Sequence, residues 1–456
     1  MKNNLLLEIV HRLGIDKSIA YSSGSRVVQG LTGVASVFFI ATFLSGEEQG
    51  FYYTFGSILG LQVFFELGLT GIMTQYVAHE ASHLKLNDDL HYAGDNRYIS
   101  RLASLIRFCV KWYSVLAVLV FIFLWIVGIL FFTRYGDGHV GISWRAPWLL
   151  ICIGTGIKLF QSPFSSILMG LGKVKEMSKI GFYQQLILPA TVWLGLACNF
   201  KLYVVGISYL MSVLIWQLYV WKTKLAMIIV NLYKVHVSET VSYLKEIFPY
   251  QWRIALSWVS GYFIYQLFNP VLFATEGAVV AGQMGMTLTA LNAINVFAVS
   301  WLNTKVPLYS QLIALKDYNY LDQIFSKTLK QMAFVCALLL SVFFLFTIML
   351  NLTQIKIGSS VLADRFLSYI PLLFMMIPVF LGQFTTSWAT YLRCHKKEPF
   401  LLNSICGGIA SCFCMFVFGH LYGLYGVTIS YTCIAVAFFP WGYWIYRTKK
   451  AEWHGK

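Results

Sequence analysis

The sequence predicts an all-α polytopic membrane protein of about twelve transmembrane helices, arranged as two six-helix lobes around a central cavity, with both termini cytoplasmic. Of its 456 residues, 58% are hydrophobic and only 12% are charged, whereas about 25% of the residues of a soluble domain are charged. Apolar stretches long enough to cross about 30 Å of hydrocarbon recur along the whole chain. The expected spans are residues 27–44, 51–77, 107–132, 146–172, 180–198, 202–222, 251–273, 278–304, 329–350, 367–391, 399–420 and 423–446.

The distribution of Lys and Arg fixes the expected orientation. The chain has 34 of these residues, and few of them fall in the odd-numbered connections between spans. Because basic residues stay on the cytoplasmic side, both termini and the even-numbered connections are expected there. The net charge of +15 follows from this distribution, so it predicts contact with membrane lipids and no nucleic acid partner. The basic residues of the odd-numbered connections are Arg134, Arg145, Lys201, Lys356 and Arg365.

Three segments are expected along the chain. Residues 1–222 form an N-terminal six-helix lobe that starts with an interfacial helix, since the first apolar patch is interrupted by Glu8 and lacks the cleavage site of a secretory signal. Residues 223–247 form a cytoplasmic linker, in which the Ser-Glu-Thr run at 238–240 is a candidate helix start. Residues 248–456 form the C-terminal six-helix lobe.

Weak internal similarity supports two related halves. Residues 164–173 align with residues 384–393, and both segments have hydroxyl residues after a Phe and end in a basic residue. Arg26 and Arg253 each stand at the inner mouth of the first helix of a half. Membrane transporters are often built from such repeats, with the substrate site between them.

Charged side chains within two spans are candidates for function. Glu66 falls near the middle of span two and Lys158 near the middle of span four, where each would cost roughly 2.5–3.5 kcal/mol if it faced lipid. Gln62, Glu66 and Thr70 recur every four residues and so share one helix face. Two interpretations stay open: these groups line a watery cavity, or Glu66 and Lys158 form a buried structural ion pair.

A second polar lining is expected from the other half. Asn292, Asn295 and Asn303 lie along one side of span eight, and span seven offers Gln266 and Asn269. These amides either line a cavity for a large hydrophilic cargo or hold helices together, at about 0.6 kcal/mol per hydrogen bond.

Arg26 and Arg253 are candidate ligands for a phosphorylated head group. Guanidinium groups bind phosphate in a bidentate manner, and the two residues occupy equivalent places in the two halves. The alternative is that each is an ordinary anchor whose charged end reaches the membrane interface.

One enzyme motif has to be weighed. His79-Glu80-Ala81-Ser82-His83 matches the HExxH pattern of zinc proteases, but it lies at the end of a span, without a third ligand nearby. We therefore expect no metal site, no catalytic residue and no enzyme activity. The nine cysteines are expected to pack in spans rather than to form disulfides, and no nucleotide-binding loop is present, so no cofactor is expected.

Several motifs resemble the polysaccharide-transporter branch, the O-antigen and capsular repeat-unit flippases, of the multidrug/oligosaccharidyl-lipid/polysaccharide flippase superfamily. They are Phe65-Glu-Leu-Gly-Leu69 with Thr74-Gln-Tyr76, then Pro163 with Gly170-Leu-Gly-Lys173, and Gly282-Gln-Met-Gly285. The resemblance implies export of a lipid-linked oligosaccharide, usually on undecaprenyl pyrophosphate, across the bacterial inner membrane. It also implies a cationic cavity, which Arg26, Lys158 and Arg253 would match.

The predicted function is thus a flippase that works by alternating access. Glu66 would couple a proton or sodium ion, or would balance the charge of Lys158. Polysaccharide polymerases or ligases are the expected protein partners. A cation-coupled multidrug antiporter of the same superfamily is the main alternative. A metalloprotease is disfavoured by the position of the HExxH motif at the end of a span, and a glycan polymerase is disfavoured because the connections predicted to lie outside are short.

Overall fold

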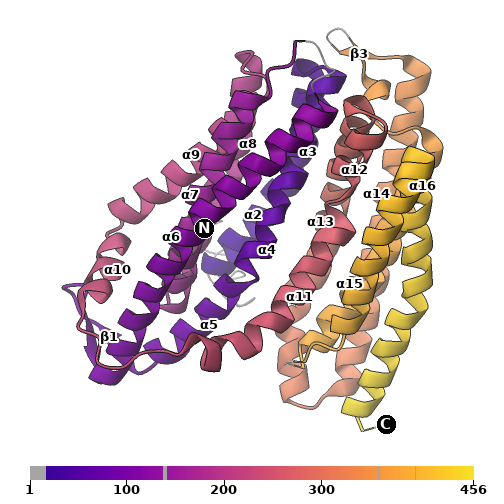
Figure 1. Cartoon of the computed structure of the whole chain (residues 1–456). Helices are drawn as coiled ribbons and strands as arrows, with labels where there is room; N and C mark the ends of the chain where they lie inside the picture. Colours follow the sequence, from indigo (N-terminus) through magenta and orange to yellow (C-terminus); the bar gives the residue numbers. More distant parts are fainter. Residues whose placement is uncertain (1–16, 137–140, 358–359, 396, 456) are drawn as a thin grey trace, which may run out of the picture. The chain divides into compact units, whose positions relative to one another are not determined.

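The computed structural model describes residues 17–136, 141–357, 360–395 and 397–455 (Figure 1), and it is all-helical apart from two short hairpins. The first half of the chain contains α2 (Lys17–Phe43), α3 (Gly46–Leu59), η1 (Gly60–Gln62), α4 (Val63–Glu66), α5 (Leu69–Ala81), β1 (Leu84–Leu86), β2 (Tyr92–Gly94), α6 (Asn96–Tyr135), α7 (Arg145–Gly170), α8 (Val174–Ala197), α9 (Tyr203–Lys222) and α10 (Leu225–Lys234).

The second half starts with a π-helical turn. It contains η2 (Tyr243–Ile247), α11 (Phe248–Tyr265), α12 (Phe268–Thr275), α13 (Ala278–Ala314), α14 (Tyr318–Thr353), β3 (Lys356–Ile357), β4 (Ser360–Val361), η3 (Leu362–Arg365), α15 (Tyr369–Arg393) and α16 (Leu401–Trp453). Strands β1 and β2 pair antiparallel with Lys85 opposite Ala93, and β3 pairs antiparallel with β4.

Every expected span falls largely on helical residues, although the number of spans stays a prediction. Among the described residues, seven single helices are long and apolar enough to cross a membrane, or eight if the bent pair Gly46–Glu66 and Leu69–Ala81 is one span. Helix α16 counts once in this tally, yet its 53 residues would be about 80 Å long. Gly423, with φ 55° and ψ −132°, breaks it into two helices, as the expected spans 399–420 and 423–446 require.

The linker differs from its prediction. The prediction of a helix that starts at Ser238-Glu-Thr240 is wrong, because these residues are not helical. The amphipathic helix of the linker is α10, which lies earlier in the chain. The hydroxyl of Ser100 on α6 accepts the backbone N–H groups of both Ser238 and Glu239 at 2.8 Å. The backbone N–H groups that would form the first turn of this helix therefore donate to α6 instead. Residues 1–16 of the expected interfacial helix lie outside the described residues.

Contacts divide the chain into two compact units, which we describe separately. The first unit takes its described residues from 1–28, 61–131 and 143–255, and the second takes them from 29–60, 132–142 and 256–456. The second unit thus includes α3 from the first half of the sequence. The predicted lobes, residues 1–222 and 248–456, stay a prediction.

In the second unit, glycines bring α3 and α13 into backbone contact. A Cβ atom on Gly50 would lie 1.9 Å from the carbonyl oxygen of Ala278, and one on Gly285 would lie 2.3 Å from the Tyr53 ring. The Gln49 amide crosses the same contact and donates to the Gly282 carbonyl at 2.7 Å. Small residues permit this close approach of membrane helices, and α13 to α16 lie side by side next to it (Figure 1).

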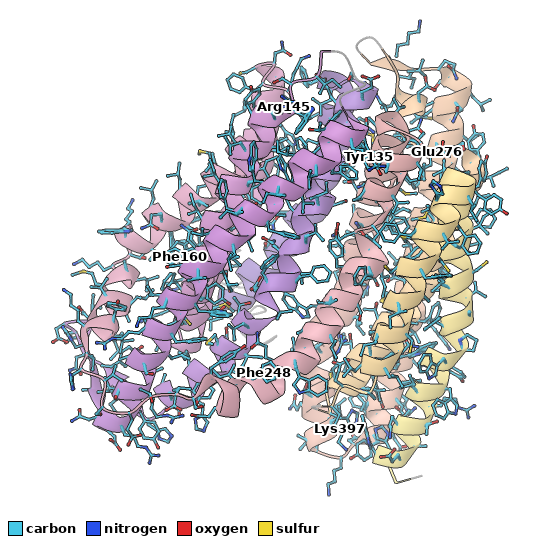
Figure 2. All side chains as sticks on the ribbon, in the orientation of Figure 1. Tyr135, Arg145, Phe160, Phe248, Glu276 and Lys397 are labelled. Carbon is cyan, nitrogen blue, oxygen red and sulfur yellow. The ribbon has the colours of Figure 1, made fainter. Side chains whose placement is uncertain are left out.

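The turn that divides α16 is held from outside the helix. The Glu276 carboxylate, just after α12 (Figure 2), accepts the N–H of Leu424 at 3.2 Å. Gly423 allows this approach, since a Cβ at its position would lie 1.6 Å from the same carboxylate oxygen. Its positive φ is also a conformation that favours glycine.

The first unit is built around α5, α7 and α9. Thr74 donates its hydroxyl to the Ser166 carbonyl at 3.2 Å, and a Cβ on Gly170 would lie 2.7 Å from the Thr74 carbonyl oxygen, so α5 and α7 are in close contact. Pro163 lies inside α7 without ending it. Because proline leaves the carbonyl four residues earlier without a donor, the Ser162 hydroxyl donates to the Leu159 carbonyl at 2.8 Å instead.

Candidate functional site: a polar cavity in the second unit

The second unit contains a cavity of about 570 Å³. It lies among α3, the junction of α11 and α12, α13, α15 and the second part of α16. Its polar lining consists of amides, hydroxyls and tyrosines: Gln266, Asn269, Asn292, Asn295, Ser57, Thr289, Thr386, Tyr53, Tyr265 and Tyr431. Among the described residues that line it, none is charged. The cavity therefore suits a neutral ligand with many hydroxyl groups.

The break between α11 and α12 provides one wall. Helix α11 ends at Tyr265 and α12 begins at Phe268, so Gln266 stands at the interruption. Asn269, one turn later, donates its amide N–H to the Ser57 hydroxyl at 3.1 Å. Its carbonyl oxygen is buried and has no hydrogen-bond partner among the described residues. Such a group is costly to bury unpaired, and it offers an acceptor to a ligand.

Helix α13 provides the opposite amides. Asn292 and Asn295 are three residues apart and both line the cavity, as the spacing predicts. The Asn295 side-chain oxygen accepts the amide of the buried Gln383 on α15 at 2.7 Å, which fixes its orientation. Asn303 lies further along α13 and is not among the cavity residues. The asparagines of α13 thus both line the cavity and join α13 to α15.

In the first unit, Glu66 lies directly before a break in the chain. Leu67 and Gly68 both have positive φ, 50° and 68°, and separate α4 from α5. The left-handed conformation costs a residue such as Leu roughly 1–2 kcal/mol, so the surrounding structure must hold it. The Glu66 carboxylate accepts the Thr70 hydroxyl at 2.6 Å. Gln62, one turn earlier, is the last residue of η1.

Lys158 has a different environment. Its ammonium nitrogen lies 5.2 Å from the ring centroid of Tyr209 on α9, and its side chain is exposed in the first unit. Thr74 on α5 contacts Ser166 on α7. Glu66 lies eight residues before Thr74, and Lys158 lies eight residues before Ser166. Even so, no ion pair within 4 Å joins Glu66 to Lys158, both of which the structure describes. The interpretation of a structural ion pair is therefore not supported by the structure.

The exchange of these two charges tests that result. We expect the double variant Glu66→Lys with Lys158→Glu to show no rescue relative to the single variants, with a coupling energy below about 0.5 kcal/mol. The measurement is a double-mutant cycle on thermal unfolding of the purified protein. Recovery of wild-type stability in the exchanged variant would restore the ion-pair interpretation.

Arg26 lies on α2 and Arg253 on α11, but their side chains are outside what the structure describes. Their role as phosphate ligands stays a prediction.

A network that the sequence did not reveal joins the linker to α5 and α6. The Arg101 guanidinium contacts the Glu246 carboxylate at 2.6 Å and the Glu80 carboxylate at 3.1 Å, and the Tyr76 hydroxyl donates to Glu246. Burial alone would raise the pKa of Glu246, but the bonds from Tyr76, the Ser242 N–H and Arg101 lower it from 4.5 to about 2. Glu246 therefore stays ionised and holds the linker to these helices.

The same network includes Glu80, the acidic residue of the HExxH motif. The carboxylate of Glu80 is bound by Arg101, and the His83 ring stacks on Tyr98 with centroids 4.2 Å apart. Within the described residues, no group of three or more His, Cys, Asp or Glu side chains could hold a metal ion. One carboxylate oxygen of Glu80 and the ring of His83 are thus engaged in contacts with α6.

No family model and no curated protein matches the sequence, but solved structures resemble it over nearly its whole length. A multidrug resistance MATE family transporter of the MOP superfamily, in an inward-facing conformation, is 14% identical, with a TM-score of 0.66 over 94% of this chain and 95% of its own. The lipid II flippase MurJ, in an inward closed conformation, is 12% identical, with a TM-score of 0.62 over 93% and 87%.

A further match is the MATE multidrug transporter DinF-BH. It is 14% identical, with a TM-score of 0.58 over 97% of this chain and 98% of its own. At these identities the likeness shows the fold alone. The chain has an all-α polytopic membrane fold like that of the MATE transporter and MurJ, which confirms the predicted fold class at that level.

Proposed function

We propose that this chain is a flippase that moves a lipid-linked oligosaccharide across the bacterial inner membrane, with an undecaprenyl-pyrophosphate-linked surface-polysaccharide repeat unit as its cargo. The observation that carries the proposal is the uncharged cavity lined by amides, hydroxyls and tyrosines. Amides both donate to and accept from sugar hydroxyls, and tyrosine rings offer apolar faces with a polar end. MurJ, which has the same fold, is by name a lipid II flippase.

The charged part of the cargo needs basic residues. Arg26, Arg253 and Lys158 are the proposed ligands of the pyrophosphate. Lys158 supports this role, because it is exposed and has no acidic partner within 4 Å among the described residues. A charge does not cross bare hydrocarbon at a useful rate, and basic groups in a watery site lower that barrier.

Alternating access would carry the head group across while the lipid tail stays in the bilayer. Glu66 is the proposed group that couples a proton or sodium ion, with Gln62 beside it. The break at Leu67 and Gly68 supports this role, because interrupted membrane helices free backbone carbonyls that bind cations. Polysaccharide polymerases or ligases would receive the product.

A cation-coupled multidrug antiporter is the second candidate. Glu66, an acid within an expected span, favours it, and DinF-BH, which has the same fold, is by name a multidrug transporter. The absence of a carboxylate among the described cavity residues favours the flippase instead. Binding of an undecaprenyl pyrophosphate-linked sugar, in competition with a cationic dye, separates the two. Dye binding without binding of the pyrophospholipid would overturn the flippase.

The cavity amides give a direct test. We expect Asn292→Ala with Asn295→Ala to raise the apparent KM for lipid-linked oligosaccharide about tenfold in reconstituted liposomes, since each lost hydrogen bond is worth about 0.5–1.5 kcal/mol. Asn351→Ala, at the exposed end of α14, serves as the matched control and should leave the KM unchanged. An unchanged KM in the double variant would exclude the cavity as the sugar site.

A further inference from the structure

A second cavity continues the polar cavity of the second unit. It has a volume of about 330 Å³ and lies between α15 and both parts of α16, beside the end of α11. The two cavities adjoin, because the same five residues line both: Tyr265, Pro378, Gly382, Thr386 and Tyr431. From Gly382 the lining of the second cavity follows α15 for about three turns to Arg393. The connection that follows Arg393 is predicted to be cytoplasmic.

Two buried polar groups in the second cavity have no partner. The Ser411 side chain lines the cavity and is 1% exposed, and its hydroxyl has no hydrogen-bond partner among the described residues. The same holds for the buried amide nitrogen of Asn403, which lies eight residues earlier on α16 and lines the same cavity. A buried donor without an acceptor is costly. Both groups can donate to an oxygen atom of a ligand.

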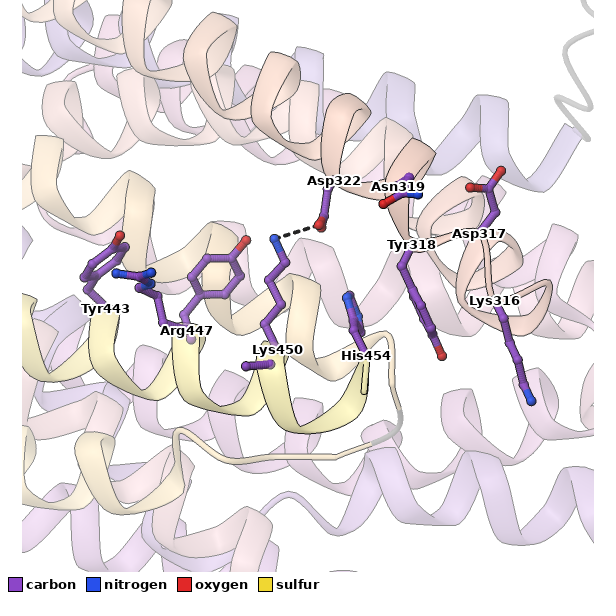
Figure 3. A pocket seen from close by; sticks show the side chains of 11 residues that line it. Lys316, Asp317, Tyr318, Asn319, Asp322, Tyr443, Arg447, Lys450 and His454 are labelled. Atoms are coloured by element: carbon purple, nitrogen blue, oxygen red, sulfur yellow. Dashed lines mark ion pairs between the residues drawn. The ribbon is translucent and has the colours of Figure 1, made fainter. Parts of the chain in front are cut away.

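A third cavity of this unit is different. It has a volume of about 620 Å³, lies between the start of α14 and the last turns of α16 (Figure 3), and shares no residue with the other two. Its Asp322 pairs with Lys450 at 2.8 Å and accepts the Tyr391 hydroxyl at 2.7 Å. Among the described residues of its lining that are not exposed, none has a buried polar side-chain atom without a hydrogen-bond partner. The third cavity therefore gives no sign of a ligand.

The remaining lining of the second cavity suits a sugar better than a hydrocarbon chain. It combines apolar rings with hydroxyl groups, from Phe400, Phe438, Phe439, Thr385 and Ser404. Among the described residues that line it, Arg393 has the one charged side chain, and both oxygens of the Glu398 carboxylate bind it, at 2.6 and 3.1 Å. A hydrocarbon chain would leave the Asn403 amide and the Ser411 hydroxyl unpaired. A sugar offers apolar faces to the rings and oxygen atoms to the two donors.

We propose that the second cavity binds further sugar residues of the lipid-linked oligosaccharide, so that the cargo is a chain of at least two sugars that extends from one cavity into the other. This assignment rests on the proposed function, because it takes the polar cavity as the site of the first sugars. Asn403 and Ser411 donate to sugar oxygens. Gly382 leaves the junction open to the chain, because nothing lies within 4 Å of a Cβ at its position.

The test compares two ligands on the purified full chain in detergent. One is the undecaprenyl pyrophosphate-linked repeat unit extracted from cells that make this protein, and the other carries only the first sugar of that unit. We expect the repeat unit to bind at least about tenfold more tightly than the single sugar. Asn403→Ala with Ser411→Ala should weaken binding of the repeat unit about tenfold, and should change the Kd of the single sugar less than about twofold.

The matched control is Asn319→Ala with Ser326→Ala. It removes the same two kinds of group from exposed positions on α14, and it should leave the Kd of both ligands unchanged. In every variant the Kd of the single sugar also reports that the polar cavity is intact.

Gly407→Leu tests the same cavity without removing a polar group. Gly407 lines the second cavity and not the polar cavity, so the new side chain would fill only the second. We expect it to weaken binding of the repeat unit about tenfold and to spare the single sugar. Gly407→Ala is its control, because a Cβ at this position would lie 3.8 Å from the nearest atoms of Ile264 and Phe438, which is an ordinary contact distance.

Equal affinity of the wild-type protein for the two ligands would overturn the second sugar site and leave the proposed function standing. Equal weakening of both ligands by Asn403→Ala with Ser411→Ala would also overturn it. If neither ligand binds the wild-type protein, the proposed function fails, and the second sugar site fails with it. If the double variant does not fold, the two Gly407 variants give the same comparison.

Discussion

Replacing Arg26 and Arg253 together by alanine is expected to reduce export of the lipid-linked oligosaccharide to below about 1% of the wild-type level while membrane insertion stays normal. Each arginine would supply charge-assisted hydrogen bonds worth about 1.5–3 kcal/mol to a pyrophosphate. Loss of both removes at least about 3 kcal/mol, which is about a hundredfold in binding. The measurement is complementation of a surface-glycan defect, together with protein quantity in isolated membranes.

The matched control is Arg97→Ala with Arg393→Ala. Both of these arginines are at least half exposed, and each is paired with a loop glutamate, Glu239 or Glu398. Exposed pairs contribute about 0–1 kcal/mol, so this control should export normally. Full export by the Arg26 and Arg253 variant would refute the role of these residues as pyrophosphate ligands. A lysine double variant with partial export would show that bidentate geometry matters in addition to charge.

Gly50→Ala is expected to destabilise the second unit by about 3 kcal/mol or more. The new Cβ would lie 1.9 Å from a backbone oxygen of Ala278, and a backbone atom cannot swing aside as the end of a side chain can. Helices α3 and α13 would have to separate, and the Gln49 bond to the Gly282 carbonyl would break with them. Overpacking of this kind typically costs about 1–3 kcal/mol, and more when backbone must move.

The measurement for Gly50→Ala is thermal unfolding in detergent together with the yield of folded protein. Gly261→Ala on α11 is the control, because nothing lies within 4 Å of a Cβ at that position. In a helix interior, alanine should even gain about 0.5–1 kcal/mol over glycine. A Gly50 variant as stable as the Gly261 variant would contradict the close contact between α3 and α13.

The helices could be predicted from the sequence because apolar runs of span length are a strong signal. Even the division of α16 was predicted, since one expected span ends at residue 420 and the next begins at Gly423. The break at Leu67 and Gly68 was not, because leucine rarely adopts a left-handed conformation and gives no sign of doing so.

Part of the candidate site was also accessible from the sequence. The spacing of Asn292 and Asn295 places both on one face of a helix, and both line the polar cavity. Tyr53 and Tyr431 could not be assigned to it, because aromatic residues make up 17% of the chain and these two come from helices distant in sequence. The environment of Lys158 depends on Tyr209, a neighbour that only the packing of α7 against α9 supplies.

The contact between α3 and α13 also affects how the protein is made. Gln49 and its acceptor at Gly282 are 233 residues apart, and ribosomes add about 5–20 residues per second. The glycine-bearing face of α3 is therefore in the bilayer for about 10–50 s before its partner has been synthesised. During biogenesis this face must be covered by lipid or by an insertion factor, so assembly of the second unit cannot finish until translation has passed α13.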